Sequence, residues 1–201
     1  MSSKLRACAN CGSLWGSIGV LCKFCWKALL SQMNLQVLPL PHFNVYFLLL
    51  WTESNANIVG KLIYSLKGGG LQEGFQQLAE VFVYLARWQS QSVLVPAPAK
   101  VPFASDHAFR WAQCLSAEAA FPVKNILFRQ STQIQKESSK KERANVKIGS
   151  IGGSGCAKSN IIFVDDVLTT GSTAQAAYEV LGKPENFAVW CLAYRPLLAE
   201  K

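Results

Sequence analysis

Acidic residues are scarce in this chain, and none occurs before Glu53. Charged residues make up only 16% of the 201 positions and half are hydrophobic, which excludes wholesale disorder and predicts a sizeable core. Long apolar runs are also lacking. The longest, Val45–Trp51, is too short to span a bilayer and predicts a buried strand. No apolar segment follows Lys4 and Arg6 as a signal peptide would require, so we expect a cytoplasmic protein with no membrane span.

The shortage of acids leaves a formal net charge of +8, and the basic residues gather in two stretches. One lies in the first thirty positions. The other comprises Lys124, Arg129, Lys136, Lys140, Lys141, Arg143 and Lys147. Basic faces of this kind attract nucleic acid, pyrophosphate or an anionic membrane, although a solvated surface is an equally good interpretation of the lysines alone.

Four cysteines near the start form two C-x-x-C pairs, Cys8/Cys11 and Cys22/Cys25. Two such pairs can close a tetrahedral thiolate shell around zinc, with no open position for catalysis. So short a segment has too little core to fold alone, and the metal would supply on the order of 10 kcal/mol or more. Disulfides are the alternative, which a cytoplasmic location disfavours. The remaining cysteines, Cys114, Cys156 and Cys191, show no ligand spacing and are expected in the core or as incidental residues.

Apolar spacing predicts two helices between Ile58 and Leu85, separated by a flexible break at 67–70. Strands are expected at 92–95, 123–128, 161–164 and 187–193, a helix at 109–120, and a loose hairpin or linker at 149–159. This alternation predicts an α/β fold with a mostly parallel sheet flanked by helices. A ligand site is then expected at the carboxyl ends of the strands, near Ala97 and Asp165.

The stretch 160–173 carries the strongest functional signal. An apolar strand ends in Asp165 and Asp166, a turn of small and hydroxylated residues follows, and a helical pattern begins at Ala174. Free N–H groups and the helix dipole make such a turn a phosphate cradle. Carboxylates repel a bare polyphosphate, so the pair is expected to face sugar hydroxyls or a hydrated metal ion. The alternative is an ordinary turn in which Asp166 and Ser172 act as caps.

This combination resembles the signature of the type I phosphoribosyltransferases, which bind 5-phosphoribosyl-1-pyrophosphate (PRPP). The resemblance implies that Asp165 and Asp166 are catalytic and hold the ribose 2′- and 3′-hydroxyls. It implies a 5′-phosphate site made of Thr169, Thr170, Gly171, Ser172 and Thr173. Gly171 suits a tight turn where the backbone approaches a ligand.

Further motifs precede the cradle in order: the cysteine knuckle, Lys61-x-x-Tyr64-x-Leu-Lys67-Gly68, Val95-Pro-Ala-Pro98 and the segment 135–146. In this order they resemble the ComF (competence protein F) family over nearly the whole chain. The resemblance implies a double zinc ribbon-like knuckle at 1–32 and a type I phosphoribosyltransferase-like domain at 33–201. It also implies a pyrophosphate loop of Ala97, Pro98, Ala99 and Lys100, and a lid that contains Gln135, Lys136, Arg143 and Asn145. A solvated connection is the alternative to a lid.

The implied reaction displaces pyrophosphate from ribose C1 by a nitrogen nucleophile. Magnesium would accompany PRPP, and Lys100, Lys136 and Arg143 would complete the shell around the leaving group. Where ComF proteins carry Arg-Gly-Phe-Asn-Gln, this chain has His107-Ala-Phe-Arg-Trp111. His107 is either a substrate contact or, more ordinarily, a surface or capping residue.

Three functions stay open. The first, implied by the ComF resemblance, is a PRPP-binding protein that supports DNA uptake, with single-stranded DNA or a DNA-uptake helicase as partner. The second is an active phosphoribosyltransferase in nucleotide salvage or synthesis, and the third a PRPP sensor without catalysis. Trp15 and Trp26 either stack on bases or pack a small core.

Overall fold

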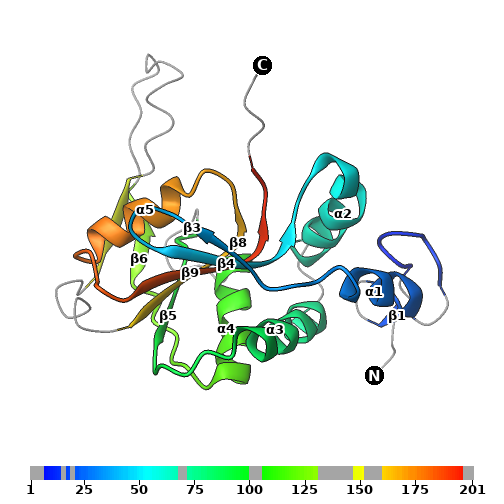
Figure 1. Cartoon of the computed structure of the whole chain (residues 1–201), viewed down its shortest axis with the longest axis horizontal. Helices are drawn as coiled ribbons and strands as arrows, with labels where there is room; N and C mark the ends of the chain where they lie inside the picture. Colours follow the sequence, from blue (N-terminus) through cyan, green and yellow to red (C-terminus); the bar gives the residue numbers. More distant parts are fainter. Residues whose placement is uncertain are drawn as a thin grey trace, which may run out of the picture.

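The structure, a computed structural model, describes residues 7–14, 17–18, 21–67, 72–99, 106–130, 147–151 and 160–196. A five-stranded sheet lies at its centre, in the order β3-β4-β9-β8-β5 (Figure 1). The strands are β3 (Gln36–Pro39), β4 (Asn44–Leu50), β9 (Phe187–Tyr194), β8 (Ile161–Leu168) and β5 (Val93–Pro96). β3 is antiparallel to β4, and every other pairing is parallel. The predicted α/β fold with a mostly parallel sheet is confirmed.

Helices cover both faces of the sheet (Figure 1). α3 (Gln72–Ala86) and α4 (His107–Ala119) lie on one face, and α5 (Ser172–Val180) lies on the other. α2 (Ala56–Lys67) follows β4 after the 3-10 turn η1 (Glu53–Asn55), and packs its apolar side into the core that α3 and α4 cover. Side chains alternate along β8 because successive residues of a strand point to opposite faces: Ile162 and Val164 join this core, and Phe163 joins the α5 core.

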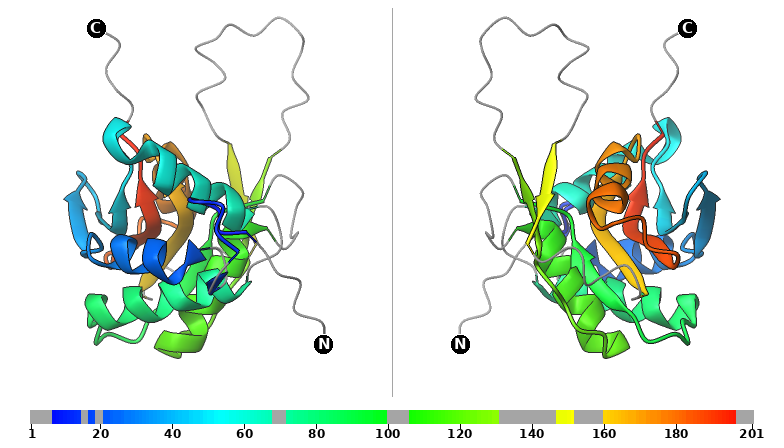
Figure 2. Two further views of the ribbon diagram at one scale, coloured as in Figure 1. Left: turned by 90° about the vertical axis from the view of Figure 1, so that its right-hand side faces the viewer. Right: turned by 90° about the vertical axis from the view of Figure 1, so that its left-hand side faces the viewer.

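The cysteine segment packs on the same core as α2 and α3. It contains β1 (Ser17–Ile18), β2 (Leu21–Cys22) and α1 (Lys23–Leu30). Leu21 and Leu29 are buried in one cluster with Leu62 of α2 and Leu78 of α3. Figure 2 shows this segment beside the two helices.

A second small sheet lies against α5. Its strands, β6 (Leu127–Arg129) and β7 (Ile148–Ser150), are antiparallel, and the Ser150 hydroxyl donates to the Val180 carbonyl (3.4 Å). The strand predicted at 123–128 is therefore shorter than expected, because Val123 forms only an isolated parallel bridge to Leu94. Of the loose hairpin or linker predicted at 149–159, Gly149 and Ser150 belong to β7 instead.

The prediction that the strand ends at the acid pair is wrong. β8 continues to Leu168, because Val167 and Leu168 pair with Ala193 and Tyr194 and so extend the ladder past both carboxylates. The turn that follows is correspondingly short, and α5 begins at Ser172 rather than Ala174.

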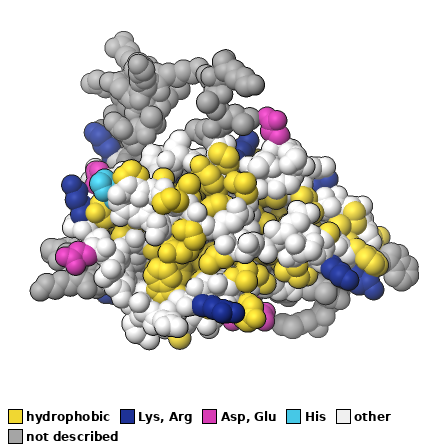
Figure 3. Space-filling view, in the orientation of Figure 1, with side chains coloured by type: hydrophobic (Ala, Val, Ile, Leu, Met, Phe, Trp, Pro, Cys, Tyr) yellow, Lys and Arg dark blue, Asp and Glu magenta, His cyan; other side chains and the backbone are white. Residues whose placement is uncertain are grey.

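On the face of the molecule shown in Figure 3, the basic side chains of the described residues do not gather into one cluster. In Figure 3, hydrophobic side chains spread over the middle of the face, and the Lys and Arg side chains lie apart from one another around its rim. None of the helices in the described part of the chain combines the length and the apolar character that a bilayer crossing needs.

Candidate functional site

The acid pair lies near the carboxyl end of β8, beside the end of β5. The N–H of Ala97 donates to the carbonyl of Val164 (2.8 Å), which brings Ala97 next to Asp165 as the sequence predicts. Successive residues of a strand point to opposite faces, so the two carboxylates leave β8 on different sides. They therefore have different partners.

Asp166 turns toward α2 and α4 and is only 3% exposed. The ammonium of Lys67, the last residue of α2, lies 2.8 Å from its Oδ2, and Nε2 of His107, the first residue of α4, lies 3.5 Å from its Oδ1. Oδ2 is buried, and the ammonium lies at the distance of a charge-assisted hydrogen bond to it. Sequence reasoning assigned no role to Lys67, because nothing local in the sequence pairs it with Asp166.

Asp165 lies in a different environment, beside Cys191 of β9. Its Oδ1 accepts a hydrogen bond from the N–H of Asp166 (2.9 Å). Burial first, and then the neighbouring carboxylate of Asp166, hold the pKa of Asp165 well above its usual range. Asp165 therefore takes up a proton more readily than an ordinary aspartate does.

The turn after β8 has the features of an anion site. Gly171 has a φ of +77° and is the N-cap of α5. The hydroxyls of Thr170 and Ser172 lie 2.9 Å apart, and the N–H of Ser172 donates to Thr170 Oγ1 (3.3 Å). The first turn of α5 contains no acidic residue, so no side chain of that turn offsets the positive end of the helix dipole.

In the segment predicted to bind pyrophosphate, some backbone groups already have hydrogen-bond partners within the fold. Ala97, Pro98 and Ala99 are buried. The N–H of Ala97 belongs to the sheet, proline has no N–H, and the carbonyl of Pro98 accepts from Arg129 Nε (3.1 Å). Of these three residues, only Ala99 can offer its backbone N–H to an anion.

A hollow of about 590 Å³ lies where β4 and β9 end, at the carboxyl edge of the sheet. The N–H of Arg195 donates to the carbonyl of Leu168 (2.8 Å), which places the rim of the hollow next to the turn after β8. The guanidinium of Arg195 lies over the ring of Trp51, 4.7 Å from its centroid. The hollow is lined by Trp51, Thr52, Glu53, Ser54, Ala56, Arg195 and Pro196.

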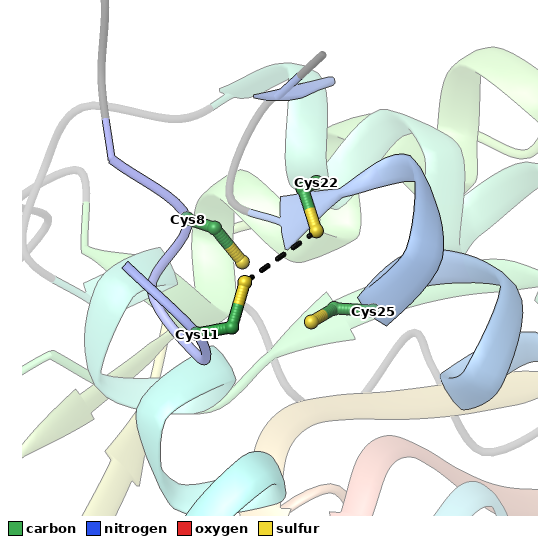
Figure 4. Close-up of side chains that lie close together, drawn as sticks. All are labelled: Cys8, Cys11, Cys22 and Cys25. Carbon is green, nitrogen blue, oxygen red and sulfur yellow. Dashed lines mark hydrogen bonds between the residues drawn. The ribbon is translucent and has the colours of Figure 1, made fainter. Parts of the chain in front are cut away.

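The four N-terminal cysteines point toward one another (Figure 4). Their sulfurs all lie within 4.8 Å of one another, and those of Cys11 and Cys22 are 3.7 Å apart. Ligands 2.3 Å from a tetrahedral zinc are separated by about 3.8 Å, so small shifts of these side chains would allow all four sulfurs to bind one zinc ion. Asn10 Nδ2 donates to Cys25 Sγ (3.4 Å), as a residue that orients a metal ligand does.

The pKa values of the Cys8 and Cys25 thiols in this cluster also differ from the ordinary value. Burial opposes ionisation of Cys8, but hydrogen bonds from the backbone of Cys11, Cys22 and Asn10 lower its pKa to about 6. At Cys25 the bond from Asn10 favours the thiolate, yet burial and the other three sulfurs raise the pKa to about 12. Four thiolates therefore need a metal ion to coexist here.

Several predicted residues lie outside the part of the chain that the structure describes: Lys100, Gln135, Lys136, Arg143, Asn145, Trp15 and Cys156. Trp26 is partly buried against the core, in line with the packing alternative. Cys114 and Cys191 are buried, as predicted.

No family model matches the chain, and no curated protein does either. Among solved structures, similarity is found to adenine phosphoribosyltransferase from Saccharomyces cerevisiae at 16% identity and a TM-score of 0.41, over 87% of this chain and 89% of that one. Hypoxanthine phosphoribosyltransferase from Staphylococcus aureus matches at 15% identity and 0.41, over 61% and 62%.

An allosteric regulatory enzyme of purine biosynthesis matches at 12% identity and a TM-score of 0.41, over 61% of this chain and 25% of that enzyme. The chain thus spans less than two thirds of the length of this enzyme and of the hypoxanthine enzyme. At such low identities and TM-scores the likeness is distant.

Proposed function

We propose that the chain binds PRPP at the carboxyl edge of β8 and β5 and transfers its phosphoribosyl group to a nitrogen nucleophile. One observation carries the proposal. A buried carboxylate, Asp166, lies a few residues before a hydroxyl-lined helix start whose first turn contains no acidic residue. Acceptors for sugar hydroxyls and donors for a phosphate thus occur in one short stretch at the carboxyl end of β8.

The roles follow from charge. Thr169, Thr170, Gly171, Ser172 and Thr173 would hold the 5′-phosphate, and the two aspartates the ribose hydroxyls. The C1–O bond to pyrophosphate breaks with its electron pair leaving on oxygen, and a C1–N bond forms as the nucleophile loses a proton. An ionised carboxylate of the acid pair would stabilise the positive charge that develops on the ribose ring.

Magnesium would accompany PRPP, and carboxylate oxygens are ligands that this ion accepts. Asp165 and Asp166 would hold it, directly or through water, and when bound it would neutralise charge on the leaving pyrophosphate. The nucleophile would enter through the hollow beside Trp51 and Arg195, which adjoins the phosphate turn.

Calorimetric titration with PRPP and magnesium tests the binding, and pyrophosphate release across a panel of nucleobases and amines tests the transfer. We expect Asp166→Asn to weaken PRPP affinity about tenfold or more, because an acceptor for a hydroxyl becomes a poorer one. Glu185→Gln, at an exposed position outside the site, is the control for lost negative charge. Unchanged affinity in an Asp165→Asn/Asp166→Asn double variant would refute the site. Binding without pyrophosphate release would leave a sensor.

We also propose, as the ComF-like role in DNA uptake, that the cysteine knuckle contacts single-stranded DNA. Phe24 supports this, since it is 72% exposed on α1 with the ammonium of Lys23 5.1 Å from its ring centroid. Fluorescence anisotropy with a labelled oligonucleotide tests it. Phe24→Ala should weaken binding severalfold, and Tyr84→Ala, an equally exposed aromatic on α3, should not.

A further inference from the structure

We propose that Lys67 and His107 are positioning residues which hold the carboxylate of Asp166 in the orientation that the ribose hydroxyls require. The inference rests on the proposed function and extends it to two residues on other elements.

Lys67 lies at the end of α2, from where its ammonium reaches Asp166. As the last residue of the helix it lies at the negative end of the dipole, which stabilises its ammonium. The Lys67 side chain is 34% exposed, whereas the Asp166 side chain is only 4% exposed. Removing a carboxylate from water is costly, and a cation at 2.8 Å offsets the cost.

His107 is fixed from the other side by the start of α4. Asp106 is the N-cap, and its Oδ1 accepts from the N–H of Phe109 (3.1 Å). His107 is therefore the first residue of α4, and its Nε2 lies 3.5 Å from Oδ1 of Asp166. The sequence left a capping role open for His107, and Asp106 takes that role; the His107 side chain is 37% exposed and places Nε2 near Asp166.

Two helices therefore converge on one carboxylate, one at each oxygen. The Lys67 ammonium, at 2.8 Å, occupies one lone pair of Oδ2. A carboxylate oxygen has a second lone pair, so Oδ2 can also accept from a ligand hydroxyl while Lys67 fixes its position.

The test compares PRPP with inorganic phosphate, since only PRPP carries the ribose. Calorimetry on the full chain should show that Lys67→Met weakens PRPP about tenfold or more and leaves phosphate within about twofold. Lys67→Arg should restore most of the loss. His107→Ala should give a smaller loss, because its contact is longer. Lys124→Met, at an exposed position, removes the same charge elsewhere. Asp166→Asn combined with Lys67→Met should cost no more than Asp166→Asn alone, because both act through one carboxylate.

Each outcome has a distinct meaning. Wild-type affinity for PRPP in Lys67→Met, or additive losses in the double variant, would overturn this inference and leave the proposed function intact. Equal losses for PRPP and phosphate would overturn it too, since they indicate general damage. If the wild-type chain binds no PRPP, the proposed function fails and this inference with it.

Discussion

Gly171 holds the turn after β8 in a left-handed conformation, with a φ of +77°. An added Cβ would lie 3.5 Å from Leu40 Cδ1, an ordinary contact, so the backbone rather than space requires glycine here. We expect Gly171→Ala to lower the free energy of unfolding by about 1 kcal/mol and to weaken binding of inorganic phosphate, because the strained turn relaxes away from its N–H geometry. Denaturant unfolding and calorimetry measure the two effects.

Gly182 offers a matched control, since it has a φ of +84°, open space around its Cβ position and a place at the far end of α5. Gly182→Ala should cost similar stability and leave phosphate binding unchanged. Equal phosphate affinities in the two variants would contradict the role of the turn.

β8 shows how far the sequence predicts an element and where it stops. Its apolar run, the parallel pairing and the helix after it were predictable from local spacing. Its last residues, Val167 and Leu168, were not, since two carboxylates before them look like a strand end and only pairing with β9 keeps them in the sheet. The short edge strand β3 was missed, because it has only four residues and Pro39 argues against a strand. The contact of Lys67 with Asp166 joins α2 to β8 and has no local signature.

The knuckle gives a prediction at the scale of an element, from the thiol of Cys25. A ligand must lose its proton to bind metal, and the pKa of Cys25 in the metal-free cluster is about 12. Lower pH therefore favours the protonated, metal-free state. We expect zinc affinity to fall about tenfold or more for each pH unit between pH 8 and 6, as measured by competition with a chromogenic chelator. Cys114→Ala, outside the cluster, should leave the curve unchanged, and an affinity independent of pH would exclude thiolate ligation.

At the scale of the whole molecule, the knuckle and the candidate site are joined by α2. Leu29 of the knuckle shares one core with Leu62 of α2, and the ammonium of Lys61 donates to the carbonyl of Asn10 (3.1 Å), between two of the cysteines. The same helix ends at Lys67. The predicted division into 1–32 and 33–201 stays a prediction, although this shared core gives the first part a structural task in the second.

Removal of the proposed zinc ion should therefore weaken binding at the proposed PRPP site. We expect Cys25→Ser, or a chelator on the wild-type chain, to lower the Tm and also to weaken PRPP severalfold, because a loosened knuckle no longer seats the helix that presents Lys67. Lys61→Met should reproduce part of the loss in affinity with metal still bound, and Lys27→Met, exposed on α1, controls for charge. A lower Tm with unchanged PRPP affinity would mean that α3 and the sheet hold α2 in place without the knuckle.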